Sequence, residues 1–284
     1  VNIAQLPFWA LSVYYSWRCF KFNKKIDFFI LGIVLGLGVL SKYLFIYLII
    51  GIKLFFLYVI ITKKNKAKIG NYFITGSITT LILLPHILWL FENDFITINY
   101  AFQRTGGLGS IFDHFTFPII FLLKQLSILF PLFFMIYFLI RKIKFKINLK
   151  DQKFIFLFYL ILIPIILIFF TSAIIGIKIR TMWMTPFYLF FGAFIVYLFQ
   201  KQIFMTNVKK FIFVFIFFLI LSPTTYFIIS KLDETKRTDY PGKEISRLVQ
   251  NKWNNNFSNE IKVVIGDEWS AGNLSYHLNS RPRW

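Results

Sequence analysis

The apolar runs of this chain are too long and too numerous for a domain that folds in water. One of them, from Phe28 to Ile61, covers 34 residues, whereas one membrane-crossing helix needs about 20. Charged residues make up only 15% of the chain, against about a quarter in soluble domains. The apolar residues form continuous blocks and not the alternating pattern of an outer-membrane barrel. We therefore predict an all-α polytopic membrane protein.

Eight membrane spans are predicted from the positions of the apolar blocks. The 34-residue run is expected to turn at Ser41-Lys42-Tyr43, which leaves a short second span and allows a tight or partly re-entrant hairpin. The spans cover approximately residues 3–20, 27–41, 44–61, 69–91, 117–140, 154–175, 183–200 and 208–229.

Basic residues gather in alternate loops between these spans. The formal net charge of +20 is compatible with nucleic-acid binding, but cations confined to short loops between apolar runs are typical of membrane topology. One set of loops carries 16 cations, whereas the opposite set carries 4 cations and 3 acids. The positive-inside rule makes the first set cytoplasmic and the second external. The basic loop residues are Lys21, Lys24, Lys25, Lys63, Lys64, Lys66, Lys68, Arg141, Lys142, Lys144, Lys146, Lys150, Lys153, Lys201, Lys209 and Lys210.

The last part of the chain has a different, mixed-charge composition. We predict a transmembrane helical domain over residues 1–229 and an incomplete extracytoplasmic α/β segment over residues 230–284. Asp239-Tyr240-Pro241-Gly242 is typical of a helix start, and the β-branched run at residues 261–265 predicts a short strand. Because Val1 enters an apolar segment at once and the chain stops at Arg283-Trp284, we interpret it as a fragment open at both ends.

The composition limits the chemistry that the chain can carry. Cys19 is the single cysteine, which excludes an internal disulfide and a zinc cluster of the cysteine type. The sequence has no phosphate loop, nucleophile elbow, paired metal ligands or dinucleotide fingerprint. Two glycosylation sequons, at Asn256 and Asn273, are interpreted as chance because the Lys/Ile/Asn-rich composition is typical of bacteria.

Polar residues gather at the predicted external ends of the spans. Lys42 either anchors the protein to lipid head groups or provides a cation for a lipid phosphate. Gly32, Gly36 and Gly38, which precede it, are interpreted as positions where another helix packs closely. His86 is interpreted as a packed, hydrogen-bonded residue more readily than as a base.

Two external loops carry further candidates. The loop after the fourth span contains Glu92, Asp94 and Arg104, and loops of this length are often functional. The short loop over residues 176–183 carries Lys178 and Arg180 on the side where cations are otherwise rare, which indicates an anionic ligand.

Motifs in a fixed order along the chain resemble those of a known family. The chain resembles bacterial membrane glycosyltransferases of the dolichyl-phosphate-mannose–protein mannosyltransferase superfamily, which includes the aminoarabinose transferase of lipid A. The matching stretches are Phe8-Trp9-Ala10-Leu11, Gly36 to Tyr43, Pro85 to Trp89, Thr105-Gly106-Gly107, Gln125 with Pro131, Gly176 to Arg180, Tyr240-Pro241-Gly242 and Gly266 to Asn273.

The resemblance implies a class C glycosyltransferase fold in the cytoplasmic (inner) membrane. Such enzymes transfer a sugar from a polyprenyl-phosphate carrier to an acceptor at the external face, with inversion. The acidic residue that the family uses to activate the acceptor precedes Val1, so no catalytic residue is assigned. A second acidic position of the family is occupied here by Asn2.

The candidate substrate-binding residues all lie at the predicted external face. The cations are expected to hold the donor phosphate, and the acids to position a sugar, an acceptor or a divalent ion. Expected partners are the polyprenyl-phosphate donor, membrane lipids and an unidentified acceptor, without nucleic acid. The candidates are Lys42, Tyr43, His86, Glu92, Asp94, Arg104, Lys178 and Arg180.

Two alternatives to an enzyme stay open. A transporter or flippase of lipid-linked glycans would be expected to show internal repeats and charges at the bilayer midplane, and neither pattern is evident. A non-catalytic membrane scaffold is the other alternative.

Overall fold

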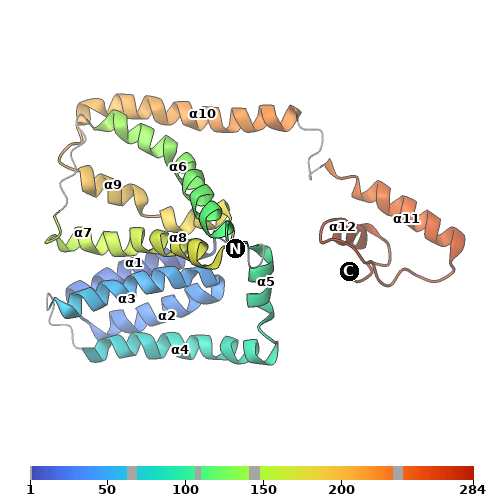
Figure 1. The fold of residues 1–284 in the computed structure, drawn as a ribbon, viewed down its shortest axis with the longest axis horizontal. Helices are drawn as coiled ribbons and strands as arrows, with labels where there is room; N and C mark the ends of the chain where they lie inside the picture. Colours follow the sequence, from blue (N-terminus) through green and yellow to red (C-terminus); the bar gives the residue numbers. More distant parts are fainter. Residues whose placement is uncertain (1, 63–68, 106–109, 141–147, 233–238) are drawn as a thin grey trace. The chain divides into compact units, whose positions relative to one another are not determined.

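The computed structural model describes residues 2–62, 69–105, 110–140, 148–232 and 239–284, and their regular structure is helical (Figure 1). The prediction of a helical membrane protein is confirmed. The chain divides into two compact units, Val1–Phe215 and Ile216–Trp284. The predicted domain boundary after residue 229 stays a prediction.

Each predicted span corresponds to one helix or to two or three consecutive helical segments. The α-helices are α1 Gln5–Phe22, α2 Lys25–Ser41, α3 Ile46–Ile61, α4 Ile69–Glu92, α5 Ile96–Arg104, α6 Asp113–Leu139, α7 Gln152–Leu157, α8 Ile163–Ile175, α9 Phe191–Phe199, α10 Val208–Leu232, α11 Gly242–Asn256 and α12 Ser270–His277. The other helical segments are the 3₁₀-helices η1 Tyr43–Phe45, η3 Thr181–Tyr188 and η4 Met205–Asn207 and the π-helix η2 Phe158–Leu162.

Five helical stretches of the described residues are long and apolar enough to cross a membrane. They are Tyr43–Ile61, Gly70–Glu92, Asp113–Leu139, Gln152–Ile175 and Met205–Leu232. The pair η3 and α9, bent by 53°, makes a sixth if it forms one broken span. Helix α2 has 17 residues, fewer than the about 20 of a straight crossing. The count of eight spans therefore stays a prediction.

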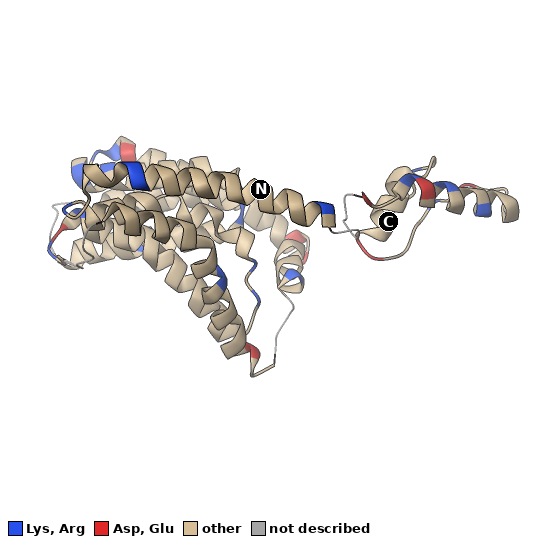
Figure 2. Ribbon diagram, turned by 90° about the horizontal axis from the view of Figure 1, so that it is seen from above, with Lys and Arg blue, Asp and Glu red and all other residues tan. Residues whose placement is uncertain are grey.

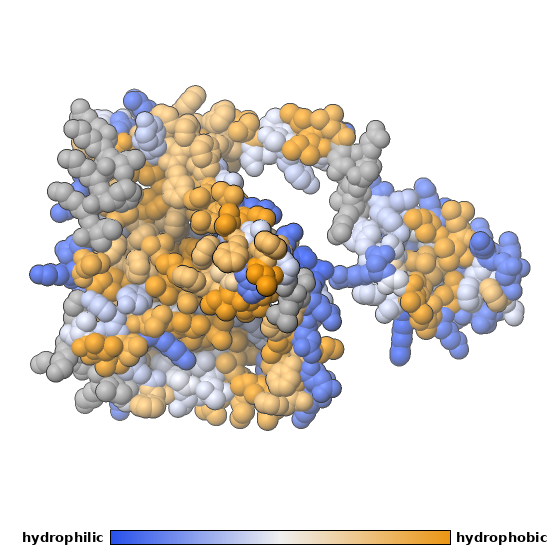
Figure 3. Space-filling view, in the orientation of Figure 1, coloured by the Kyte–Doolittle hydropathy of each residue, from blue (hydrophilic) through white to orange (hydrophobic). Residues whose placement is uncertain are grey.

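The surface of the first unit has the polarity that a bilayer requires. Only 6% of the apolar window of α4 and 11% of that of α6 are buried inside the protein, so these helices present apolar side chains outward. Figure 3 shows an apolar band across this unit, with hydrophilic residues toward its edges. A surface of this kind is stable in contact with lipid and not with water.

Glycines explain how the long apolar run folds into a hairpin. Helix α2 ends at Ser41, Lys42 is extended, and η1 begins at Tyr43, which confirms the predicted turn. A Cβ on Gly38 would lie 2.4 Å from the ring of Phe45, so the glycine lets this ring pack against the end of α2.

The packing of α2 against α4 depends on two more glycines. A Cβ on Gly32 or on Gly36 would lie 2.8 Å from side-chain atoms of α4, those of Ile78 and Ile82 respectively. The hydroxyl of Thr79 also donates a hydrogen bond of 3.1 Å to the carbonyl of Gly32. The interpretation of these glycines as close-packing positions is confirmed.

The loops of the first unit lie at two opposite ends. One end holds Lys42 and the loop that carries Lys178, and we name this end the Lys42 end. There the backbone N–H of Lys178 donates a hydrogen bond of 3.3 Å to the carbonyl of Thr105. At the opposite end, Ile140 and Ile203 form an antiparallel bridge. Figure 2 shows Lys and Arg gathered at the opposite end, with long uncharged stretches of helix between the two ends. The separation agrees with the predicted loop alternation, while the assignment of a membrane side to each end stays a prediction.

The C-terminal segment forms helices, and where a strand was expected its described residues form a single bridge. Within residues 239–284, Val263 forms one parallel bridge with Arg283, and the predicted strand over residues 261–265 is wrong in extent. The pairing does not continue to Arg281, because Arg281 has a positive φ of 43° and its N–H donates instead to the carbonyl of Leu278 at 3.2 Å. Helix α11 begins at Gly242, where the sequence predicts a helix start, and α12 follows the bridge segment.

Candidate functional site

The ammonium group of Lys42 is held by neutral partners. Its Nζ atom lies 2.6 Å from Oδ1 of Asn2 and 5.0 Å from the centre of the Trp183 ring. The amide nitrogen of Asn2 donates to the carbonyl of Met182 at 2.9 Å, which turns its oxygen toward Lys42. Within the described residues no carboxylate forms an ion pair with Lys42. The site therefore keeps a net positive charge.

Buried Gln5 fixes the backbone at the same point. Its side-chain nitrogen donates to the carbonyl of Lys42 at 3.1 Å, so α1 supports the turn between α2 and η1. Lys42 lies between the spans, and partial burial lowers its pKa to about 8. Burial removes water from the ammonium, and this desolvation costs free energy. An anionic ligand at this point would offset that cost.

Tyr43 connects three elements next to Lys42. Its hydroxyl lies 2.7 Å from Nε2 of His86 on α4 and 2.7 Å from the hydroxyl of Thr97 on α5. The His86 ring also stacks on Trp89, with ring centres 5.7 Å apart and planes at 14°. These contacts agree with the interpretation of His86 as a packed, hydrogen-bonded residue, while its role in substrate binding stays a prediction.

The remaining predicted cations lie on two neighbouring backbone segments. Arg104 is the last residue of α5, and its guanidinium lies 5.7 Å from the centre of the Tyr100 ring. The next residue, Thr105, accepts the hydrogen bond from the backbone of Lys178. The side chain of Lys178 is exposed and that of Arg180 is partly buried. The structure thus brings the backbones of Arg104 and Lys178 together.

The predicted acids lie at the corner between α4 and α5. Glu92 ends α4, and Asp94 follows with a positive φ of 49°; both side chains are exposed. The carbonyl of Asp94 accepts a hydrogen bond of 3.0 Å from the side chain of Asn99. Within the described residues no three His, Cys, Asp or Glu side chains are grouped as a metal site. The role of these acids stays a prediction.

A second histidine at the Lys42 end was missed by the sequence reasoning. Nδ1 of His114, at the start of α6, lies 2.9 Å from the carbonyl of Ala173. A Cβ on Gly176 would lie 2.8 Å from Nε2 of the same ring, and Gly176 has a positive φ of 71°. The sequence shows a histidine at the end of the long loop and a glycine at the end of the span 154–175, but no local pattern links the two. His114 positions the loop that carries Lys178.

One family comparison bears on this site. The model of the dolichyl-phosphate-mannose-protein mannosyltransferase family matches residues 1–89, which confirms the resemblance over that part of the chain. The matched region contains Asn2, Gln5, Lys42, Tyr43 and His86. No curated protein and no solved structure matches the chain.

Proposed function

We propose that this protein is a membrane glycosyltransferase that moves a sugar from a polyprenyl-phosphate carrier to an acceptor at the external face of the cytoplasmic membrane. The observation that carries the proposal is the Lys42 ammonium, held by Asn2 and Trp183 and by no carboxylate of the described residues. The family match over residues 1–89 supports the transferase class.

The surroundings of Lys42 suit a lipid that carries a phosphate. A polyprenyl-phosphate donor presents its anion at head-group depth and its chain along the bilayer. Lys42 lies at the end of α2, and neighbouring α4 presents the exposed apolar side chains Leu84, Leu88 and Trp89. The ammonium would bind the phosphate while these side chains contact the polyprenyl chain. Arg180 and Lys178 would add donors from the short loop, and Arg180 can form a bidentate pair.

The charge change in the reaction explains how such a cation accelerates it. Transfer breaks the bond between the sugar C1 and the phosphate oxygen and forms a bond from C1 to an acceptor oxygen. The donor is a phosphodiester with one negative charge, whereas the released monoester carries about −1.5 to −2 at pH 7. A fixed ammonium therefore stabilises the leaving group more strongly than the donor, which lowers the barrier. The acceptor proton goes to a base that is not assigned within this chain.

A transfer assay on the full-length protein tests the proposal. The protein is reconstituted in vesicles with a radiolabelled polyprenyl-phosphate sugar and a cell-envelope extract that supplies acceptors. We expect the label to move from the lipid to an acceptor, with release of polyprenyl phosphate. Label that crosses the bilayer while still attached to its carrier would instead support a flippase and overturn the proposal.

A further inference from the structure

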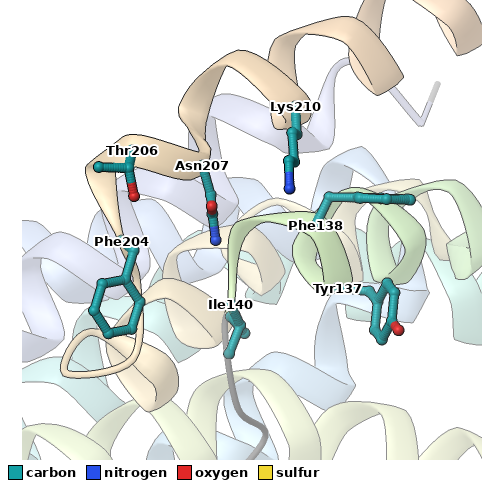
Figure 4. Close-up of a pocket in the computed structure, with 7 residues that line it drawn as sticks. All are labelled: Tyr137, Phe138, Ile140, Phe204, Thr206, Asn207 and Lys210. Carbon is teal, nitrogen blue, oxygen red and sulfur yellow. The ribbon is translucent and has the colours of Figure 1, made fainter.

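A second pocket lies at the opposite end from Lys42, between the end of α6 and the start of α10. Its volume is about 450 Å³ (Figure 4). The bridge between Ile140 and Ile203 and the hydrogen bond of 3.4 Å from the Phe204 N–H to the Leu139 carbonyl join the two chain segments that form it. Because α6 has 27 residues, the pocket lies about 40 Å along this helix from its first residue. It is therefore separate from the Lys42 site.

One wall of this pocket is polar and cationic. Figure 4 shows the polar ends of Thr206, Asn207 and Lys210 pointing the same way, from η4 and the start of α10 toward the end of α6. Within the described residues none of these three side chains has a hydrogen-bond or ion-pair partner, and no acid lines the pocket. An ammonium beside an amide and a hydroxyl suits a ligand with several anionic oxygens.

The other wall is aromatic. Tyr137 and Phe138, at the end of α6, line it together with buried Ile140, while the Phe204 ring lies beside the polar wall, on the segment that leads to Thr206 (Figure 4). A purely ionic ligand such as free phosphate gains nothing from this wall, whereas the glycerol and first acyl carbons of a lipid would contact it. The pocket also lies at the end where the basic loops gather, and such loops attract anionic head groups.

We propose that this pocket binds the phosphate ester of an anionic phospholipid. The ammonium of Lys210 pairs with the phosphate, Asn207 and Thr206 donate hydrogen bonds to its oxygens, and the aromatic wall contacts the adjoining apolar carbons. The proposal does not depend on the glycosyltransferase function. A lysine that only snorkels to head groups would need neither the cavity nor the convergent polar side chains.

Lipid titration followed by native mass spectrometry tests this site on the full-length protein. Delipidated protein is titrated with phosphatidylglycerol, with phosphatidylcholine, or with inorganic phosphate as competitor. We expect one phosphatidylglycerol to bind more tightly than the others, and Lys210→Ala to weaken it at least fivefold. Lys210→Arg should retain binding. Displacement of the lipid by inorganic phosphate at equal concentration would identify a soluble phosphate, not a lipid, as the ligand of the same site.

Lys209→Ala is the matched control, because Lys209 is the adjacent exposed lysine and does not line the pocket. If Lys209→Ala and Lys210→Ala weaken binding equally, the attraction belongs to the charged surface and the proposal is wrong. It is also wrong if neither substitution weakens binding. Lys210 is exposed, so Lys210→Ala is expected to fold, and Thr206→Val, which removes only a hydroxyl, gives a second test with an expected twofold to fivefold loss.

Discussion

Lys42 and Asn2 lie 40 residues apart in sequence, yet the Lys42 ammonium is 2.6 Å from the Asn2 side-chain oxygen. The partner is neutral, so the contact orients the ammonium without cancelling its charge. An aspartate at position 2 would instead form an ion pair. The Trp183 ring, 5.0 Å from the same ammonium, stabilises the cation through its face and is itself uncharged.

Loss of the Lys42 charge should strongly reduce sugar transfer. For Lys42→Ala we expect transfer to fall at least tenfold, equivalent to about 1.4 kcal/mol, with normal membrane insertion. Lys53→Ala is the control, since Lys53 is an exposed lysine of neighbouring α3. The measurements are donor affinity and turnover in vesicles. A Lys42→Ala enzyme within about twofold of the wild type would show that Lys42 is only a lipid anchor.

Introducing a carboxylate at position 2 should weaken donor binding. In Asn2→Asp the new carboxylate would pair with Lys42 and compete with the donor phosphate, so we expect about threefold to tenfold lower affinity. Asn2→Ala removes the hydrogen bond without adding charge and should have a smaller effect on affinity. Binding of a labelled polyprenyl-phosphate sugar distinguishes the variants. Tighter donor binding by Asn2→Asp than by the wild type would contradict this account of the site.

The glycine at the α2 turn should be essential for stability. Gly38→Ala places a methyl group 2.4 Å from the Phe45 ring, and such overpacking typically costs about 1–3 kcal/mol. Gly76→Ala on α4 is the control, because nothing lies within 4 Å of its added methyl group. It should be neutral or stabilising by up to about 1 kcal/mol. Thermal unfolding in detergent gives both values, and equal effects of the two substitutions would refute the packing role of Gly38.

Much of the helical framework could be predicted because apolar blocks and basic loops are local features of the sequence. The turn at Ser41-Lys42-Tyr43 followed from the excess length of one apolar run, and the close packing at Gly32 and Gly36 followed from their spacing before it. The strand over residues 261–265 was predicted from β-branched residues alone. It reduces to one bridge because pairing depends on a partner segment that local pattern does not specify.

The contacts that make the candidate site could not be predicted from periodicity. Asn2 meets Lys42, and Tyr43 meets Thr97 across 54 residues, through side chains that no local pattern links. His114 was missed for the same reason, since its partner Ala173 lies 59 residues away. The sequence indicated which polar residues lie at one end of the helices, but not which of them touch.

The membrane sides of the two ends can be tested by cysteine labelling. Single cysteines replace Asn65 and Lys144, which lie outside the described residues in loops predicted to be cytoplasmic. We expect an impermeant thiol reagent to label them only after the membrane is opened. Native Cys19 is buried and should stay unlabelled in the folded protein. Labelling of either loop from outside intact cells would reverse the topology and place the Lys42 end in the cytoplasm.

The lowered pKa of Lys42 predicts opposite pH effects on donor binding and on stability. Only the protonated ammonium binds the donor phosphate, and the phosphodiester keeps its single charge over the range studied. The value of kcat/KM should therefore be constant below pH 8. It should fall as the pH rises through about 8, which is the pKa of Lys42 in the folded protein. Lys42→Arg stays charged and should remove this decline. An unchanged decline in Lys42→Arg would assign it to another group.

Stability should move in the other direction over the same range. An unfolded lysine has a pKa of about 10.4, so between about pH 8 and 10.4 the unfolded chain binds more protons at this residue than the folded protein. The free energy of unfolding therefore rises with pH across this window and loses that contribution as the pH falls through 8. Bound donor should abolish the rise, because the phosphate restores the pKa of Lys42 toward its ordinary value. Denaturant unfolding of wild type and Lys42→Met, with and without donor, measures the difference. A wild-type pH dependence identical to that of Lys42→Met would show that the Lys42 ammonium is not held in the desolvated state on which the site assignment depends.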